Sequence, residues 1–134
     1  LVTNGTAELS VLDEILPYMD AMNIDLKGFS EDYYKKLGGD LDTVKHFIER
    51  AAGRDADCHV ELTTLIVPGE NDSKEEMEQE AQWIASINPD IPLHVTRFFP
   101  RYKMTDKAAT SVKRIYQLKE VAEKYLKWVY AGNC

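Results

Sequence analysis

A chain of 134 residues, of which 44% are hydrophobic and 29% charged, has the size and composition of one globular domain and excludes a disordered or multidomain protein. Its net charge of -7 argues against binding to nucleic acid or to an anionic membrane, because an acidic surface repels phosphate groups. The longest apolar run, residues 62–68, is far shorter than the ~20 residues that span a bilayer.

The sequence alternates strand and helix patterns from one end to the other. The expected strands cover residues 1–3, 20–27, 57–67, 92–99 and 128–131. The expected helices cover residues 7–19, 31–37, 41–52, 74–87 and about 111–124. The residues expected to cap these helices are Thr6, Ser30, Ser73, and either Thr110 or Ser111.

The strand of residues 57–67 shows the alternation most clearly. Its apolar face carries Val60, Leu62, Thr64 and Ile66, and its other face carries His59, Glu61, Thr63, Leu65 and Val67. We expect helices to cover the first face and the second to be a partly polar inner face. Pro68-Gly69 ends the strand, and Ser73 with Glu76 has the spacing of a capping box.

The predicted fold class is α/β, with parallel strands and outer helices in a single domain. Strand-helix alternation implies parallel strands joined by helical crossovers. A closed eight-stranded barrel takes ~250 residues, so the four to five units here make a partial (β/α) barrel or a small open sheet. Residues 1–3 and 129–134 both read as strands followed by turns, and the first residue is not methionine. We therefore expect a fragment of a larger protein, and we prefer the partial barrel.

The sharpest candidate site is the pair Asp25 and Lys27, because residues two apart on a strand point to the same face. A ligand with a carboxylate and an ammonium on one carbon suits such a pair. A salt bridge between the two side chains on an exposed edge is at least as good an interpretation from the residues alone.

Three further polar residues face the same inner side. We interpret His59 and Glu61 as charges at the solvated start of their strand. His94 either binds a ligand or is a satisfied core histidine, and we weigh the two equally. The sequence contains no phosphate-binding loop, nucleophile elbow or metal-spaced Cys/His set, and two cysteines, Cys58 and Cys134, make no disulfide scaffold. With no signal-peptide pattern, we expect a cytoplasmic protein.

Five segments in order resemble the radical S-adenosylmethionine enzymes of the pyruvate formate-lyase-activating class, over essentially the whole chain. The segments are Thr3-Asn4-Gly5, Asp25-Leu26-Lys27, the VPGEND of residues 67–72, the HVTRFFPRYKM of residues 94–104 and the WVYAGN of residues 128–133. The last two are similar to the branch called AmmeMemoRadiSam-system radical SAM proteins. The order and spacing of the segments carry the resemblance.

The resemblance implies a partial (β/α)6 barrel of which residues 1–134 form the C-terminal part. Members of the family cleave S-adenosylmethionine reductively at a four-iron, four-sulfur (4Fe-4S) cluster held by a CxxxCxxC loop, which gives a 5′-deoxyadenosyl radical. Activating enzymes use that radical to abstract hydrogen from a glycine of a partner enzyme. The parent is thus expected to be a radical SAM oxidoreductase, with a glycyl-radical or other protein as substrate.

By motif, Asp25 and Lys27 match residues beside the amino-acid moiety of S-adenosylmethionine. Asn4 matches a strand end on the same rim, Thr63 stands where the activating enzymes have arginine, and Tyr102 falls near a histidine of that class. The remaining residues that we assign to cofactor binding are Asn71, His94 and Arg97. Val2 replaces an aspartate of the activating enzymes, which together with the changes at Thr63 and Tyr102 argues against an identical substrate.

The cluster motif itself is absent, since no CxxxCxxC occurs in the sequence. We therefore expect no catalytic or metal-binding residues in this chain, and no cleavage of S-adenosylmethionine by this chain alone. A stand-alone, non-catalytic α/β binding or interaction module is the alternative. A truncated barrel would leave the first strand with an unpaired edge, so we expect the chain to associate with itself.

Overall fold

The computed structural model describes residues 2–53, 58–100 and 108–133. One parallel sheet contains five strands in chain order, which are β1 (Val2–Thr3), β2 (Ala21–Asp25), β3 (His59–Ile66), β4 (Leu93–Arg97) and β5 (Val129–Gly132). The helices are α1 (Leu9–Ile15), α2 (Glu31–Lys36), α3 (Leu41–Ala51), α4 (Lys74–Ile87) and α5 (Val112–Glu123), with a 3₁₀ turn, η1 (Leu16–Tyr18), after α1.

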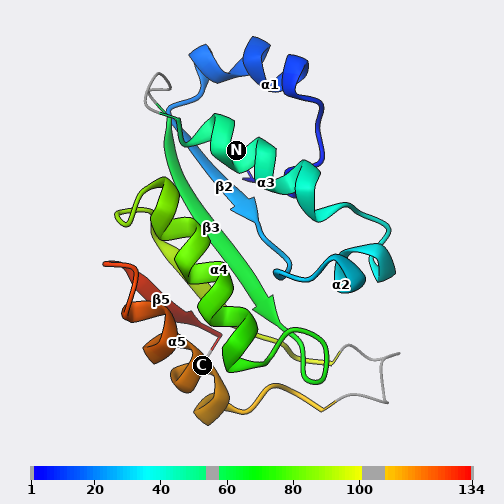
Figure 1. Ribbon diagram of the computed structural model, residues 1–134, viewed down its shortest axis with the longest axis vertical. Coiled ribbons are helices and arrows are strands. Elements are labelled where there is room, and N and C mark those ends of the chain that lie inside the picture. The colour runs from blue at the N-terminus through cyan, green and yellow to red at the C-terminus, as the bar shows by residue number, and fades with distance from the viewer. Residues whose placement is uncertain (1, 54–57, 101–107, 134) are drawn as a thin grey trace.

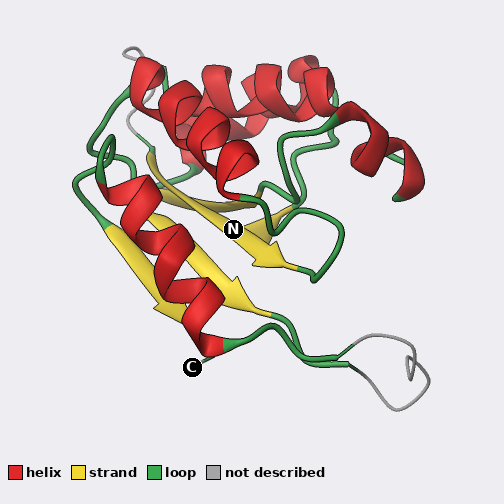
Figure 2. Ribbon diagram, turned by 60° about the horizontal axis from the view of Figure 1, so that its bottom comes forward, coloured by secondary structure: helices red, strands yellow, loops and turns green. Residues whose placement is uncertain are grey.

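The helices lie together over one face of the sheet (Figures 1 and 2). A doubly wound sheet would reverse its strand order and carry helices on both faces, whereas a barrel wall keeps the strands in chain order with its helices outside. The predicted α/β partial barrel with outer helices is confirmed. No helix in the described part of the chain is both long and apolar enough to cross a membrane.

Burial along β3 follows the predicted alternation. Val60, Leu62, Thr64 and Ile66 are buried under the helices, while His59 and Leu65 on the other face are exposed and Glu61 and Thr63 are half-buried. The same period of two runs through β2 and β4, because each strand packs one face against the helix layer. The sheet therefore has an apolar outer face and a polar inner face.

Three of the predicted caps are confirmed. The hydroxyls of Ser30, Ser73 and Ser111 accept hydrogen bonds from the backbone N–H groups three residues on, at 3.3, 3.1 and 3.1 Å. The capping box is only half formed, since the Glu76 carboxylate accepts its bond from Phe29 N–H instead. Thr110 is buried, and its hydroxyl donates to the carbonyl of Ile66.

The prediction that Thr6 caps the first helix is wrong. That helix begins at Leu9, and its N-cap residue, Glu8, forms no side-chain cap bond. Thr6 instead donates its hydroxyl and its N–H to Oδ1 of Asn4, at 2.7 and 3.2 Å. The Asn4 side chain closes a local turn, which competes successfully with helix initiation.

One carboxyl lies in the core beneath the sheet. Glu80 of α4 is 1% exposed, and Oε2 of its carboxyl accepts a hydrogen bond from the hydroxyl of Thr64, which is equally buried, at 2.9 Å. Burial raises the pKa of Glu80 to about 8; the Thr64 bond opposes this shift and the charge of Glu76 adds to it. Glu80 is therefore largely protonated in the folded protein at neutral pH.

This protonation makes stability depend on pH. The unfolded chain releases the Glu80 proton near pH 4.5 and the folded chain near pH 8, so the folded state holds the extra proton between these values. Its contribution to the free energy of unfolding is complete below pH 4.5 and is lost as pH rises to 8, at a slope of at most about 1.4 kcal/mol per pH unit. Glu80→Gln removes this part of the slope, measured by urea unfolding from pH 5 to 8. Glu75→Gln, at an exposed site on the same helix, keeps it, and parallel curves for wild type and Glu80→Gln would contradict the assignment.

Candidate functional site

A row of polar side chains crosses the inner face of four strands. The strand register pairs Asp25 with Thr63, Thr63 with His94, and His94 with Tyr130. These residues come from β2, β3, β4 and β5, so the topology brings together positions that are up to 105 residues apart in sequence (130 − 25). The first three are half-buried and Tyr130 is exposed, which leaves the row open on the side away from the helices.

Asp25 and Lys27 lie at the carboxyl end of β2, the edge at which parallel α/β folds bind ligands. Burial alternates through Ile24, Asp25, Leu26 and Lys27, which keeps the two charged residues on the same side. Within the described part of the chain, neither side chain makes a hydrogen bond or an ion pair. The salt bridge that the sequence allowed is thus absent, and both charges remain available to a ligand.

The backbone around Lys27 is held at three points. The Lys27 N–H donates to the hydroxyl of Tyr34 at 2.9 Å, and the Lys27 carbonyl accepts from Nδ2 of Asn71 at 2.8 Å. Two residues on, the Phe29 N–H donates to Oε2 of Glu76 at 3.1 Å. Sequence reasoning missed Tyr34 and Glu76, since no local pattern signals a bond between residues 29 and 76.

The side chain of Asn71 forms three hydrogen bonds with the backbone around the site. It is 3% exposed, its Oδ1 accepts from Val67 N–H at 2.7 Å, and its Nδ2 donates to the carbonyls of Leu65 and Lys27, each at 2.8 Å. Both N–H donors of the amide are therefore occupied by backbone. The loop around it also needs Gly69, whose φ of +77° is a left-handed conformation that glycine adopts without strain.

Glu61 lies between two histidines on the inner face. Its carboxylate oxygens are 2.7 Å from Nε2 of His94 and 3.2 Å from Nε2 of His59, and the bond with His94 is the main cause that lowers the pKa of Glu61. The His94 ring also stacks on Tyr130, with ring centroids 5.2 Å apart. His94 is thus satisfied by a neighbour, and the reading of Glu61 as a solvated strand-start charge misses this pairing. The alternation of polar residues on neighbouring strands was the signal that could have found it.

Of the other predicted residues, Thr63 lies beside Asp25 in the row, and the rest lie apart from it. Thr63 donates its hydroxyl to Oδ1 of Asn23 at 3.0 Å, on the inner face. Asn4 is exposed and engaged with Thr6. Arg97 donates from Nε to the Thr110 carbonyl, and its guanidinium lies 4.5 Å from the centre of the Phe99 ring. Tyr102 lies outside the described residues.

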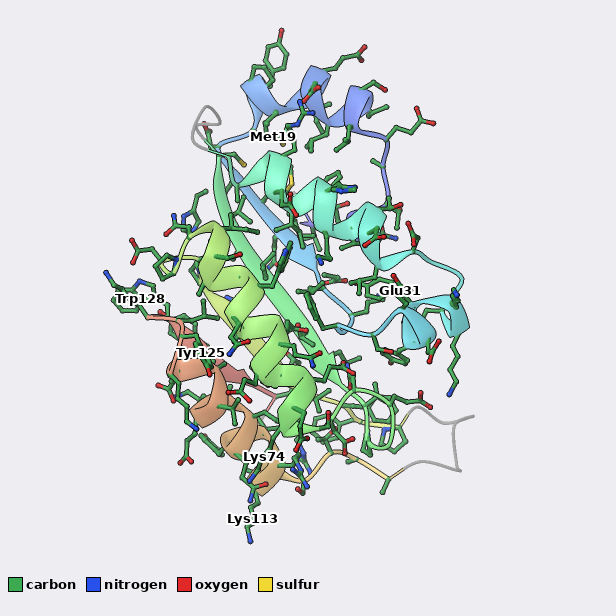
Figure 3. The ribbon with its side chains drawn as sticks, in the orientation of Figure 1. Met19, Glu31, Lys74, Lys113, Tyr125 and Trp128 are labelled. Carbon is green, nitrogen blue, oxygen red and sulfur yellow. The ribbon has the colours of Figure 1, made fainter. Side chains whose placement is uncertain are left out.

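The amino ends of the strands carry a separate open pocket of about 340 Å³. Its lining residues are His59, Glu61, Asp90, Pro92, Trp128 and Tyr130. Figure 3 shows Trp128 far from Lys74 and Lys113, which mark the first turns of α4 and α5 at the opposite edge of the sheet. The Asp25–Lys27 edge and this pocket are therefore two different places on the inner side.

The chemistry of the donors fits a zwitterionic ligand and does not fit an iron-sulfur cluster. An unpaired carboxylate and an unpaired ammonium complement an α-amino acid group. A four-iron cluster needs cysteine thiolates. Cys58 precedes β3, at the end of that strand away from Lys27, and Cys134 lies outside the described residues. In the part of the chain that the structure describes, no group of three or more His, Cys, Asp or Glu side chains could hold a metal ion.

No family model matches the sequence. An uncharacterized protein of Methanocaldococcus jannaschii is 36% identical over 135 residues, a match that covers 99% of this chain and 39% of the relative. The chain therefore spans about two fifths of the length of that curated relative.

Two solved structures are similar in fold. A domain of the pyruvate-formate lyase-activating enzyme from Bacteroides vulgatus superimposes with a TM-score of 0.81 at 18% identity, covering 98% of this chain and 79% of that one. A radical SAM methyltransferase from Sphaerobacter thermophilus gives a TM-score of 0.72 at 15% identity, covering 97% and 38%. The parallel sheet with outer helices is thus the α/β fold of a radical SAM partial barrel.

Loss of the Asn71 amide should destabilise the fold measurably. Asn71→Ala removes one buried hydrogen bond, to Val67, and two partly buried ones, to Leu65 and Lys27, so we expect the free energy of unfolding to fall by about 2–4 kcal/mol in urea titrations. Asn88→Ala is the control, because that residue accepts one exposed backbone bond, and it should cost less than about 1 kcal/mol. Equal costs for both variants would show that Asn71 does not anchor the loop.

Proposed function

We propose that this chain is the S-adenosylmethionine-binding part of a radical SAM enzyme related to the pyruvate formate-lyase-activating class, with residues 1–134 in the C-terminal part of the barrel. The observation that carries the proposal is the Asp25–Lys27 pair, two opposite charges without side-chain partners at the ligand-binding edge of this fold. The fold similarity to radical SAM proteins supports it.

Each residue of the edge has a definite role in this proposal. The Lys27 ammonium binds the carboxylate of the ligand, and the Asp25 carboxylate accepts hydrogen bonds from its ammonium or from a ribose hydroxyl. Thr63 adds a hydroxyl beside Asp25 in the row across the sheet. His94 is a proposed contact farther along the row, where its ring stacks on Tyr130 of the neighbouring pocket. Asn4 and Arg97 remain proposed contacts, as does Tyr102, which lies outside the described residues.

S-adenosylmethionine supplies radical chemistry only when a reduced 4Fe-4S cluster is beside it, and we propose that another part of the parent protein holds that cluster. The residues of this chain bind and orient the ligand. A glycyl-radical enzyme or another protein is the proposed substrate, since the activating class acts on such partners. Activity therefore belongs to the whole parent oxidoreductase.

Binding of S-adenosylmethionine tests the proposal directly. By isothermal titration calorimetry we expect the chain to bind the ligand and Lys27→Ala to weaken binding about tenfold, which is the loss of one charge-assisted hydrogen bond. Lys127→Ala is the matched control, because Lys127 pairs with Asp90 and lies apart from the Asp25–Lys27 edge. 5′-Methylthioadenosine lacks the amino-acid group, so its affinity should not respond to Lys27→Ala. An unchanged affinity of Lys27→Ala for S-adenosylmethionine would refute the proposal.

Reconstitution tests where the cluster ligands reside. After anaerobic incubation with ferrous iron and sulfide followed by desalting, we expect the chain to retain no stoichiometric iron or sulfide, because it offers only two cysteines. A polypeptide that includes a CxxxCxxC segment of the parent should retain about four of each per chain. A full four-iron cluster on the 134-residue chain would contradict the proposed division of roles.

A further inference from the structure

The loop after β2, residues 26–29, is held by hydrogen bonds along its whole length. Residues 26–29 have backbone hydrogen bonds to four other parts of the chain: Leu26 N–H to the carbonyl of Thr63 at 2.9 Å, Lys27 N–H to Tyr34, Lys27 carbonyl to Asn71, and Phe29 N–H to Glu76. These partners come from β3, α2, the loop after β3, and α4. Four parts of the chain thus hold residues 26–29, and two of these bonds are to the backbone of Lys27 itself.

The loop is also closely packed by side chains at Gly28. A Cβ atom on Gly28 would lie 3.0 Å from Oε2 of Glu76 and 3.1 Å from a ring carbon of Tyr33, closer than side chains ordinarily pack. Tyr34 is 2% exposed and Asn71 3% exposed, so neither group can turn away to solvent without opening the core. The loop therefore has little room to shift or to change its dihedral angles.

Such a rigid backbone matters because the lysine it carries is flexible. A lysine side chain has four rotatable carbon-carbon bonds, and ordering it on a ligand costs conformational entropy. Fixing the Cα–Cβ direction in advance reduces the remaining cost and keeps the side chain on the same face as Asp25. A free loop would have to be ordered by the ligand itself, at the expense of affinity.

We propose that Tyr34, Asn71 and Glu76 are positioning residues that fix the backbone of Lys27 and so direct its ammonium toward the carboxylate of the bound ligand. This inference rests on the proposed function, since it presumes that Lys27 binds S-adenosylmethionine. The three side chains act on the backbone of the loop and do not themselves contact the ligand. Asn71, which we assigned to cofactor binding from sequence, acts through Lys27 in this account.

A double-mutant cycle between Tyr34 and Lys27 tests the inference. Tyr34→Phe removes one hydroxyl, and we expect it to weaken binding of S-adenosylmethionine about threefold or more in calorimetry, within the range of coupled residues. In the Lys27→Ala background the same substitution should change affinity little, and it should not affect 5′-methylthioadenosine in either background. Tyr125→Phe is the control, because its hydroxyl bonds Glu78 and Gln82 between α4 and α5, away from the loop.

Glu76 provides a second test that leaves the core intact, because its side chain is only partly buried. Glu76→Gln keeps an oxygen that can accept from Phe29 N–H and should retain wild-type affinity, whereas Glu76→Ala should weaken binding. Glu75→Ala, on the exposed side of the same helical turn, should have no effect.

The outcomes separate the two claims. If Lys27→Ala weakens binding but Tyr34→Phe costs the same affinity in both backgrounds, or none, the positioning role is overturned while the proposed function stands. If Lys27→Ala leaves affinity unchanged, the proposed function fails and the positioning role fails with it. Circular dichroism of each variant shows whether it is folded, and affinity is compared per folded molecule.

Discussion

The amide of Asn71 is the interaction on which the proposed ligand-binding edge depends. This one buried side chain forms hydrogen bonds with the backbone of Val67 in its own loop, of Leu65 near the end of β3 and of Lys27 just after β2. Parallel strands bond to each other along their length, but their carboxyl ends diverge into loops that the ladder does not control. A buried amide with all its donors in use provides that control, because leaving any of the three backbone groups unpaired is costly.

Much of the fold follows from local patterns in the sequence. The period of two along β2, β3 and β4 reports which face is buried, and Ser30, Ser73 and Ser111 begin helices because a hydroxyl reaches the N–H three residues on. The strand order is predictable too, since each helical crossover returns the chain beside the preceding strand. The prediction that Thr6 caps a helix is wrong for a local reason, because the Thr6 N–H and hydroxyl both donate to the side-chain oxygen of Asn4.

Only part of the candidate site can be predicted from the sequence. Asp25 and Lys27 can be placed on one face from their spacing alone, but their lack of side-chain partners is a property of the folded surroundings. The bond from Phe29 to Glu76 joins residues on different elements, and no spacing rule predicts it. The pairing of Glu61 with His59 on its own strand and with His94 on the next follows from the alternation of polar residues, but its partners are settled only by the strand register. The bond that Arg97 donates to the Thr110 carbonyl is another contact that the sequence does not reveal.

The molecule therefore combines a scaffold similar in fold to radical SAM proteins with a proposed binding edge that is made by this chain's own residues. The central claim is that S-adenosylmethionine binds at the carboxyl ends of the strands, beside Lys27. Titration of ¹⁵N-labelled chain with S-adenosylmethionine, followed by amide chemical shifts, maps the contact directly. The account predicts that the largest shifts cluster on Asp25, Lys27, Thr63 and the loop of Asn71. Shifts confined to the pocket around Glu61 and Trp128, or no shifts at millimolar ligand, would contradict it.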